Sequence, residues 1–501
     1  MTTASPLPRP TAQPECPALA APGATLREWS FAERYPALAQ ALHGQPALHR
    51  QIAAHYDQIV AFCEQHVAPH VLEYERRVAA DPGYVPDELL QAACRARLFS
   101  SPFPRWLGGA GQHFLAAVIT CEVVATHCVG IANLLGVSGL ALGSVLATFD
   151  PRALHVLARL VCERERRGLP TFLSTCVTEP GAGSDAEDPD EFEHARLTTL
   201  ATPCAGGYRL RGTKVFISNG ALAQLHVVMA YTHTAHRPQD MVLLLVPSDA
   251  PGVTAARNEH KMGQMICPAT EMVFEDVFVP QHMVCRTRDH EQFAYTGLAN
   301  VLGLTRAGVG AFATGVAEGA YRATVTAVQA GMGPGLLAGQ EQWVQLEIAQ
   351  LARRAQLARA GWVDALLAVC HSGMLKPLAS MGDAGLPEQL AHTMAVQRVR
   401  QLALEHPLTD AFFKWRSASQ SERERDVATA MGDAIKVSAS DLALENCLSA
   451  ISLVGKNALR HDLGLEKRLR DAKLLQIYEG TNQINMLDFL KRRVRRQFEH
   501  V

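Results

Sequence analysis

The sequence has no excess of charge of either sign. Of its 501 residues, 47 are Lys or Arg and 49 are Asp or Glu, which leaves a formal net charge of −2. Proteins that bind nucleic acid usually carry a basic face or a high isoelectric point, so this composition argues against nucleic acid as a partner. A short basic run does occur at 491–496, and we interpret it first as the solvated end of a helix.

Clusters of cysteine are also absent. The 12 cysteines are scattered, no Cys-x-x-Cys pair occurs, and no group of Cys and His has the spacing of a zinc site, so the sequence predicts no metal centre. Residues 1–25 are rich in Pro, Ala and Thr and lack the apolar core of a signal peptide. We therefore expect a disordered leader over 1–46 and reduced thiols in the cytoplasm.

Only one uncharged stretch is long enough to suggest a membrane span. Residues 129–149 contain no charged side chain and have about the length of a transmembrane helix. The stretch nevertheless carries Asn133, Ser138, Ser144 and Thr148 as well as glycines. We expect a pair of buried helices broken near 136–139, and no membrane span.

The chain changes its periodicity twice. Apolar residues recur at helical spacing over much of 47–170, and again in 307–329, 340–368 and 425–453. Between these regions lie short segments rich in β-branched and aromatic residues, separated by turn residues: 171–177, 208–210, 214–218, 226–231, 241–246 and 271–274. The sequence predicts an α+β fold with an N-terminal helical domain (47–170), a middle β domain (171–287) that is a sandwich or a barrel, and a C-terminal helical domain (288–501). An insertion at about 370–424 contains a predicted helix at 387–405.

Three short segments contain residues suited to chemistry. In 477–484, Glu479 stands directly before Gly480, and a glutamate beside a glycine is a plausible general base because the missing side chain lets a ligand approach the backbone. The loop 178–185 follows a predicted strand and is rich in small residues, whose N–H groups can bind a phosphate or a flat heterocycle. The third segment, 208–220, includes Phe216, Ile217 and Ser218.

Taken together and in this order, the three segments resemble the acyl-CoA dehydrogenase family of flavoenzymes, over roughly 47–497. The resemblance implies the same helical, β and helical order of domains, with FAD as cofactor. It also implies that Glu479 removes the α-proton of an acyl thioester while the flavin accepts the β-hydride. Some branches of the family carry the base on an earlier helix, and the corresponding position here is Thr305.

The resemblance also implies which residues meet each ligand. FAD would contact Thr175, Cys176, Val177, Thr178, Gly183, Ser184, Phe216, Ile217, Ser218, Gly455, Thr481 and Gln483, and the substrate would meet Ser184, Arg306 and Gly480. The Phe-Ile-Ser at 216–218 stands where the family usually has Trp-Ile-Thr. The bland alternatives are a turn for 178–185, a core strand residue for Phe216 and a helix-surface ion pair for Arg306.

Three segments depart from the family pattern. The family's Arg-x-x-Phe-Gly segment, which reaches the flavin diphosphate of a neighbouring subunit, is replaced at 329–335 by a sequence with no arginine and no aromatic residue. The usual Gln-x-x-Gly-Gly segment reads Ser-Leu-Val-Gly-Lys at 452–456, where Lys456 could restore a positive charge. The insertion at 370–424 is the third departure.

Several readings follow from these patterns. The leading one is dehydrogenation of an acyl-CoA or an acyl-carrier protein thioester, in a homodimer or homotetramer, with an electron-transferring flavoprotein or another acceptor reoxidising the flavin. A flavin monooxygenase-like relative is the second, although such relatives generally lack the glutamate found at Glu479. A repurposed homologue that has lost flavin and acts as a binding or scaffold protein is the third.

Overall fold

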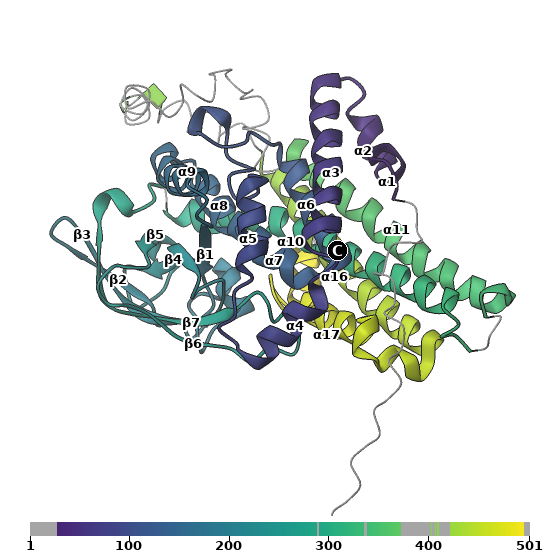
Figure 1. Ribbon diagram of the computed structural model, residues 1–501. Helices are drawn as coiled ribbons and strands as arrows, with labels where there is room; N and C mark the ends of the chain where they lie inside the picture. Colours follow the sequence, from purple (N-terminus) through teal and green to yellow (C-terminus); the bar gives the residue numbers. More distant parts are fainter. Residues whose placement is uncertain are drawn as a thin grey trace, which may run out of the picture.

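A computed structural model describes residues 28–287, 290–334, 338–371 and 421–494, together with the isolated positions 402, 406, 408 and 409. Helices form the regions before and after a central sheet, so the expected α+β architecture is confirmed. In Figure 1 the sheet lies to the left, and α11 and α16 lie to the right. The predicted helix at 387–405, and most of the expected insertion, fall outside the described residues.

The first helical region contains nine helices among the described residues. They are α1 (Phe31–Arg34), α2 (Pro36–Ala41), α3 (Pro46–His66), α4 (Val71–Ala80), α5 (Asp87–Arg95), α6 (Phe114–His127), α7 (Val129–Gly136), α8 (Ser138–Ala147) and α9 (Pro151–Arg166). Proline occupies the first turn of α2, α3 and α9, where its missing N–H has no helical partner to lose. The Asp150 side chain caps α9 by accepting from the backbone N–H groups of Arg152 and Ala153.

The prediction of a disordered leader reaching residue 46 is wrong for its last part. Ser30 caps α1 in a reciprocal capping box with Glu33. Phe31, Tyr35 and Leu38 are buried in the main core, which supplies the apolar burial that a disordered segment lacks. Residues 1–27 lie outside the described part of the chain.

The apolar stretch at 129–149 forms two helices, as expected. Helices α7 and α8 meet at Val137 with a bend of 40°, and most of their residues are buried in the protein. Among the described residues, one other helical segment, 422–459, is long and apolar enough to be compared with a membrane span, and 44% of its most apolar window is buried inside the protein.

The central region is one hydrogen-bonded sheet of seven strands. The strands are β1 (Phe172–Cys176), β2 (Leu200–Cys204), β3 (Gly207–Ser218), β4 (Ala223–Tyr231), β5 (Met241–Pro247), β6 (Val253–Asn258) and β7 (Ala269–Pro280). They are ordered β1-β4-β2-β3-β7-β6, with β5 paired to β4. The sequence predicted β1, β4, β5 and part of β7, divided β3 in two, and missed β2 and β6. The inner four residues of β6 are largely exposed, so this edge strand has no alternating apolar pattern.

The last region is built on three long helices. Helix α10 (His290–Gln329) runs along α16 (Glu422–Val454) and α11 (Gln342–His371) and also packs against α6. Two shorter helices follow, α17 (Leu465–Leu475) and α18 (Asn482–Phe489), before a π-helical turn at Leu490–Val494. The three predicted helices in this region are confirmed, although α10 begins well before residue 307.

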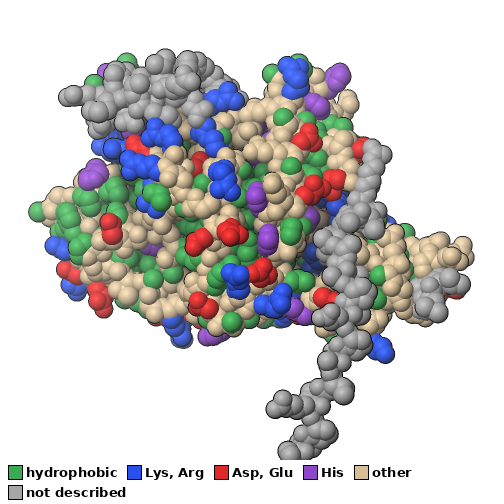
Figure 2. Space-filling view, viewed as in Figure 1, with side chains coloured by type: hydrophobic (Ala, Val, Ile, Leu, Met, Phe, Trp, Pro, Cys, Tyr) green, Lys and Arg blue, Asp and Glu red, His purple; other side chains and the backbone are tan. Residues whose placement is uncertain are grey.

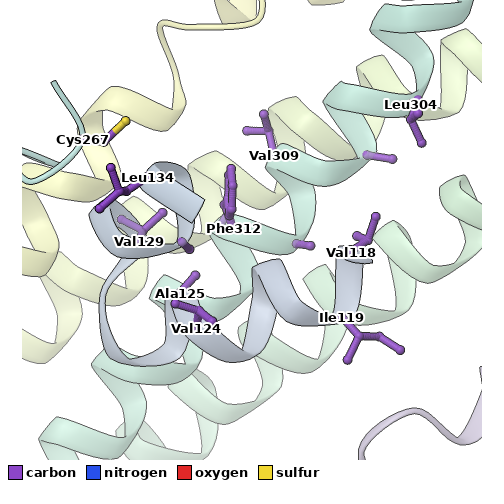
Figure 3. Packing of buried hydrophobic residues seen from close by; sticks show 14 of the residues in the cluster. Val118, Ile119, Val124, Ala125, Val129, Leu134, Cys267, Leu304, Val309 and Phe312 are labelled. Carbon is purple, nitrogen blue, oxygen red and sulfur yellow. The ribbon is translucent and has the colours of Figure 1, made fainter. Parts of the chain in front are cut away.

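A buried ion cluster joins the two helical regions. Glu122 on α6 is fully buried and accepts hydrogen bonds from Arg34, from Arg359 on α11 and from the indole N–H of Trp362. Apolar side chains from α6, α7 and α10, including Val124, Leu134 and Phe312, belong to the main buried core (Figure 3). Charged side chains of both signs are visible on the face drawn in Figure 2.

Two glycines on α10 offer a matched test of this packing. A Cβ atom at Gly308 would meet nothing within 4 Å, whereas at Gly315 it would lie 2.5 Å from the carbonyl oxygen of Glu122. Gly308→Ala should therefore stabilise the protein by ~0.5–1 kcal/mol through helix propensity. Gly315→Ala should destabilise it by ~1–3 kcal/mol through overpacking. Thermal unfolding of the two variants checks this, and equal shifts in Tm would contradict the described helix packing.

Candidate active site

One cavity lies where the three regions meet. Its volume is about 580 Å³, and it is lined by α6, α7 and α8, by the ends of β1 and β3, by α10 and by the loop between α17 and α18. The helices contribute mostly apolar side chains, such as Val118, Leu135 and Phe312. The polar groups come mainly from the strand ends and from the loop that carries Glu479. An apolar pocket with a few convergent polar groups is typical of a small-molecule site.

The loop that carries Glu479 has a constrained backbone. Glu479 adopts φ = +55° and Gly480 adopts φ = +74°, and a left-handed conformation is unfavourable for a residue with a Cβ atom. Three side chains bind the loop carbonyls: Arg306 Nε donates to Glu479 O (3.2 Å), Asn485 Nδ2 to both carbonyls, and Lys436 Nζ to Gly480 O (2.6 Å). These contacts come from α10, α16 and α18, and they hold the turn in place.

The Glu479 carboxylate faces the cavity and has one direct hydrogen bond. Thr305 Oγ1 on α10 donates to Glu479 Oε2 at 2.6 Å, so Glu479 and the alternative base position that the resemblance implies are neighbours in space. Burial raises the pKa of Glu479, opposed by the Thr305 hydroxyl and by the positive charges of Arg306 and Lys436. Burial also lowers the pKa of Lys436 to about 7, helped by the charge of Arg306. A carboxylate with a raised pKa is a stronger base once it is ionised.

Arg306 lies in a more buried environment than a helix-surface ion pair would have. Its side chain is 1% exposed and does not line the cavity. The guanidinium instead contacts Asp433 and Asp488 (2.8 Å) through Nη1 and Glu187 (3.4 Å) through Nη2. The predicted helix-surface ion pair is therefore corrected to a buried one, because a buried guanidinium needs buried acceptors. A contact of Arg306 with substrate stays a prediction.

The loop 178–185 is held beside the Glu479 loop. Glu179 is buried in an ion pair with Lys214 (2.9 Å) and accepts from the backbone N–H groups of Thr198 and Thr199. This carboxylate is structural, because its oxygens are fully engaged away from the cavity. At the other end, the Thr481 N–H donates to Ser184 Oγ (3.2 Å). The two motifs, nearly 300 residues apart in sequence, thus touch directly.

Most of the predicted site residues meet in this cavity. Its lining includes Thr175, Val177, Thr178, Gly183, Ser184, Phe216, Ile217, Ser218, Glu479, Gly480 and Thr481. Phe216 lies at a register shift in the pairing of β3 with β7, with φ = +59°, and the residue is 61% exposed. An exposed ring is not the core strand residue of the bland alternative. It is available to cover a flat ligand.

Three predicted cofactor contacts lie outside the cavity. Cys176 belongs to the core of the sheet, because successive side chains of a strand point to opposite faces and its neighbours Thr175 and Val177 face the cavity. Gly455 begins the turn Gly455–Leu459 after α16, and Gln483 is exposed on α18. Neither lines the cavity, so all three positions lie apart from the other predicted contacts, and their part in binding FAD stays a prediction.

An unpaired hydroxyl shows that the cavity suits a polar ligand. Thr175 Oγ1 is buried and has no hydrogen-bond partner among the described residues, although Thr175 lines the cavity. A buried polar group without a partner is costly, and a ligand with donors and acceptors would relieve that cost. A flavin ring is such a ligand, so the residues at this end of the cavity fit the cofactor that the resemblance implies.

The two altered segments expected near the flavin diphosphate lie together, away from the cavity. Asn457 Nδ2 donates to Met332 O at 3.3 Å, so the residues after α10 lie beside the turn Gly455–Leu459. None of these residues lines the cavity. If these two segments contact a cofactor, at least part of that cofactor must lie outside this cavity.

Sequence reasoning missed three charged residues near Glu479: Glu187, Asp433 and Lys436. Glu187 lines the cavity, and the other two are buried on α16. Glu187 comes two residues after the 178–185 loop, so its position was a usable signal. No local pattern marks Asp433 or Lys436, because both act at a distance through Arg306 or a loop carbonyl.

Comparison with known proteins agrees with this geometry. Family models described as acyl-CoA dehydrogenase N-terminal, middle and C-terminal domains match residues 50–150, 174–277 and 412–494. Cyclohexane-1-carbonyl-CoA dehydrogenase of Geobacter metallireducens is 28% identical over 407 residues, which cover 81% of this chain and 88% of that protein. Relatives with such names are oxidoreductases that act on CH–CH groups.

Solved structures share the fold over most of the chain. Butyryl-CoA dehydrogenase from Megasphaera elsdenii has a TM-score of 0.65 at 22% identity, covering 88% of this chain and 97% of that one. A chain in the structure of the electron transferring flavoprotein of Acidaminococcus fermentans has a TM-score of 0.68 at 23% identity, covering 89% and 98%. With all three domain models matched in order around the cavity of Glu479, the chain belongs to the acyl-CoA dehydrogenase family.

Proposed function

We propose that this protein is an FAD-dependent enzyme that forms an α,β-double bond in an acyl thioester, with Glu479 as the base. The observation that carries the proposal is the placement of the Glu479 carboxylate in an apolar cavity that is also lined by Ser184 and Ser218 from the two upstream motifs and by Thr175 of β1. The family is FAD-dependent, and this end of the cavity fits a flavin ring. Bound FAD would supply the hydride acceptor.

Proton removal, substrate approach and exclusion of water depend on side chains of this protein. Glu479 would take the α-proton of the substrate at its carboxylate, and Thr305 would hold that carboxylate through the 2.6 Å hydrogen bond. Gly480 lets a thioester approach the loop closely, because it has no Cβ atom. The apolar walls from α6 and α8 exclude water and accept an apolar acyl group. Either CoA or a carrier protein could bear that group, and an electron-transferring flavoprotein or another acceptor would reoxidise the flavin.

A cytoplasmic location agrees with this proposal. Of the cysteines in the described part of the chain, nine are buried and only Cys204 is exposed. Thiols that stay reduced are typical of such a compartment.

The decisive test is replacement of the base. Glu479→Gln keeps the size of the side chain and removes the proton acceptor, so the rate of flavin reduction by acyl thioesters should fall about 10²–10⁴-fold. The measurement is anaerobic bleaching of the bound flavin with a panel of acyl-CoA and acyl-carrier thioesters. Glu445→Gln, on the exposed face of α16 where Glu445 pairs with Arg354, is the control and should reduce at the wild-type rate.

Three results would reject the proposal. Unchanged bleaching of Glu479→Gln would remove Glu479 from the reaction. A wild-type protein that binds flavin but is not bleached by any thioester would favour the monooxygenase-like reading, and one that binds no flavin would favour a scaffold.

We also propose that FAD is held firmly at its ring and loosely at its diphosphate. The ring-side residues line the cavity, whereas the segments at 329–334 and 452–456 lie elsewhere and contain no arginine. Each lost charge-assisted hydrogen bond costs about 1.5–3 kcal/mol.

FAD should therefore be lost on dialysis. Adding FAD back should raise Tm, because a ligand at 100 times its Kd stabilises the folded state by ~2.7 kcal/mol. Ala330→Arg should tighten binding. Full FAD after long dialysis would contradict this account.

Finally, we propose a homodimer or homotetramer. Trp343, Leu346 and Leu357 on α11 are about half exposed or more, as are Leu448 on α16 and Leu459 after it. Exposed apolar side chains that gather on neighbouring helices are typical of subunit contacts. Light scattering should show a mass of two or four chains. A stable monomer with full flavin occupancy would refute the proposal.

A further inference from the structure

The cavity contains a second carboxylate besides Glu479. Glu187 ends the short turn η2 (Ser184–Glu187) and lines the cavity together with Ser184 and Glu479. Its side chain is 18% exposed, and its Oε2 accepts from Arg306 Nη2 at 3.4 Å. The same oxygen lies 3.2 Å from the place that a Cβ atom on Gly480 would occupy. Glu187 is therefore packed directly against the loop that carries the proposed base.

Arg306 connects this carboxylate to the base. One edge of the guanidinium contacts Glu187, and its Nε donates to the backbone carbonyl of Glu479. The remaining nitrogen, Nη1, contacts Asp433 and Asp488. The guanidinium thus has acceptors on α16, α18, η2 and the Glu479 loop, and moving or discharging any one of them changes the field at Glu479.

We propose that Glu187 is a positioning residue of the active site, which holds Arg306 against the Glu479 loop and places a second, titratable negative charge beside the base. The inference rests on the proposed function, because it assigns Glu187 a part in the proton transfer to Glu479. Glu187 itself need not touch the substrate.

The charges around Glu187 affect how the carboxylates of Glu187 and Glu479 titrate. Burial raises the pKa of Glu187 to about 7, with Arg306 lowering it and the charge of Glu479 raising it. The other charged groups facing this cluster are Asp433 and Lys436 on α16 and Asp488 on α18, whose second partner is Arg492. Within this proposal Glu479 ionises first, and its charge then raises the pKa of Glu187. Ionisation of Glu187 then makes Glu479 a stronger base, since like charges disfavour each other.

This order predicts two steps in the pH dependence of flavin reduction. The first step is the ionisation of Glu479, and the second, near pH 7, follows ionisation of Glu187. If the neighbouring charge makes Glu479 about one pKa unit more basic, a Brønsted slope of roughly one half makes the second step about threefold. Asp433 also has a pKa that burial raises to about 7, so the wild-type profile alone does not assign the second step.

Glu187→Gln assigns that step. This variant keeps an acceptor for Arg306 but cannot ionise, so its anaerobic flavin reduction should keep the lower step and lose the upper one. Glu187→Asp retains a carboxylate and should retain the upper step. Asp188→Asn is the matched control, because Asp188 pairs with Lys491 (2.6 Å) and does not line the cavity. A Glu187→Gln profile that superposes on the wild-type profile, with flavin content intact, overturns the inference.

A second readout needs no substrate. A folded-state pKa raised to about 7 contributes stability below the unfolded pKa of about 4.3, and that stability is lost as pH rises through 7. The Tm of wild-type protein minus that of Glu187→Gln should therefore fall between pH 5.5 and pH 8.5. In a Glu479→Gln background the fall should move to lower pH, because Glu479 no longer raises the pKa of Glu187.

The two readouts separate the inference from the proposed function. If thioesters do not bleach the wild-type flavin, the proposed function fails, and the Tm series still decides whether Glu187 and Glu479 are coupled. If bleaching occurs but Glu187→Gln changes neither the upper step nor the pH dependence of Tm, the proposed function stands and the role of Glu187 is wrong.

Discussion

The buried positive charge of Arg306 is the constraint on which the site depends. A guanidinium that is 1% exposed must be surrounded by acceptors, and these come from η2, α16, α18 and the carbonyl of Glu479. Four segments of the chain therefore contact this guanidinium beside the cavity. Removing a partner would leave a buried charge without compensation, which is costly, so the elements around Glu479 have little freedom to move apart.

The same contacts account for the unusual backbone at Glu479. A left-handed conformation at a glutamate is strained by an amount on the order of 1–3 kcal/mol. It persists because Arg306, Asn485 and Lys436 bind the two carbonyls of the turn. The turn directs the carboxylate toward Thr305 and the cavity. Strain at this position is thus balanced by hydrogen bonds from three helices, and the carboxylate is held in one orientation within an apolar pocket.

Sequence reasoning was most accurate where a residue and its neighbours form one local unit. The loop 178–185, the end of β3 and the Glu479 loop were all identified, and most of their residues line one cavity. It was less accurate where consecutive residues were all predicted to face one site. Cys176 was predicted to contact the cofactor together with its neighbours, although alternation along the strand points its side chain into the sheet core. It was also less accurate at edges, because β6 is too exposed to show a strand pattern, and α1 and α2 are too short to show a helical one.

By itself the sequence determined the order of helical and β regions and the short motifs, because each depends on residue type and local spacing. Only the tertiary structure decided which groups Arg306 and Glu187 contact. The position of Arg306 on α10 is equally compatible with a surface ion pair and with a buried one, and the choice depends on Asp433 and Asp488, which lie more than 120 residues away in sequence. Burial and long-range charge pairing arise only when the chain is packed, so no local pattern could reveal them.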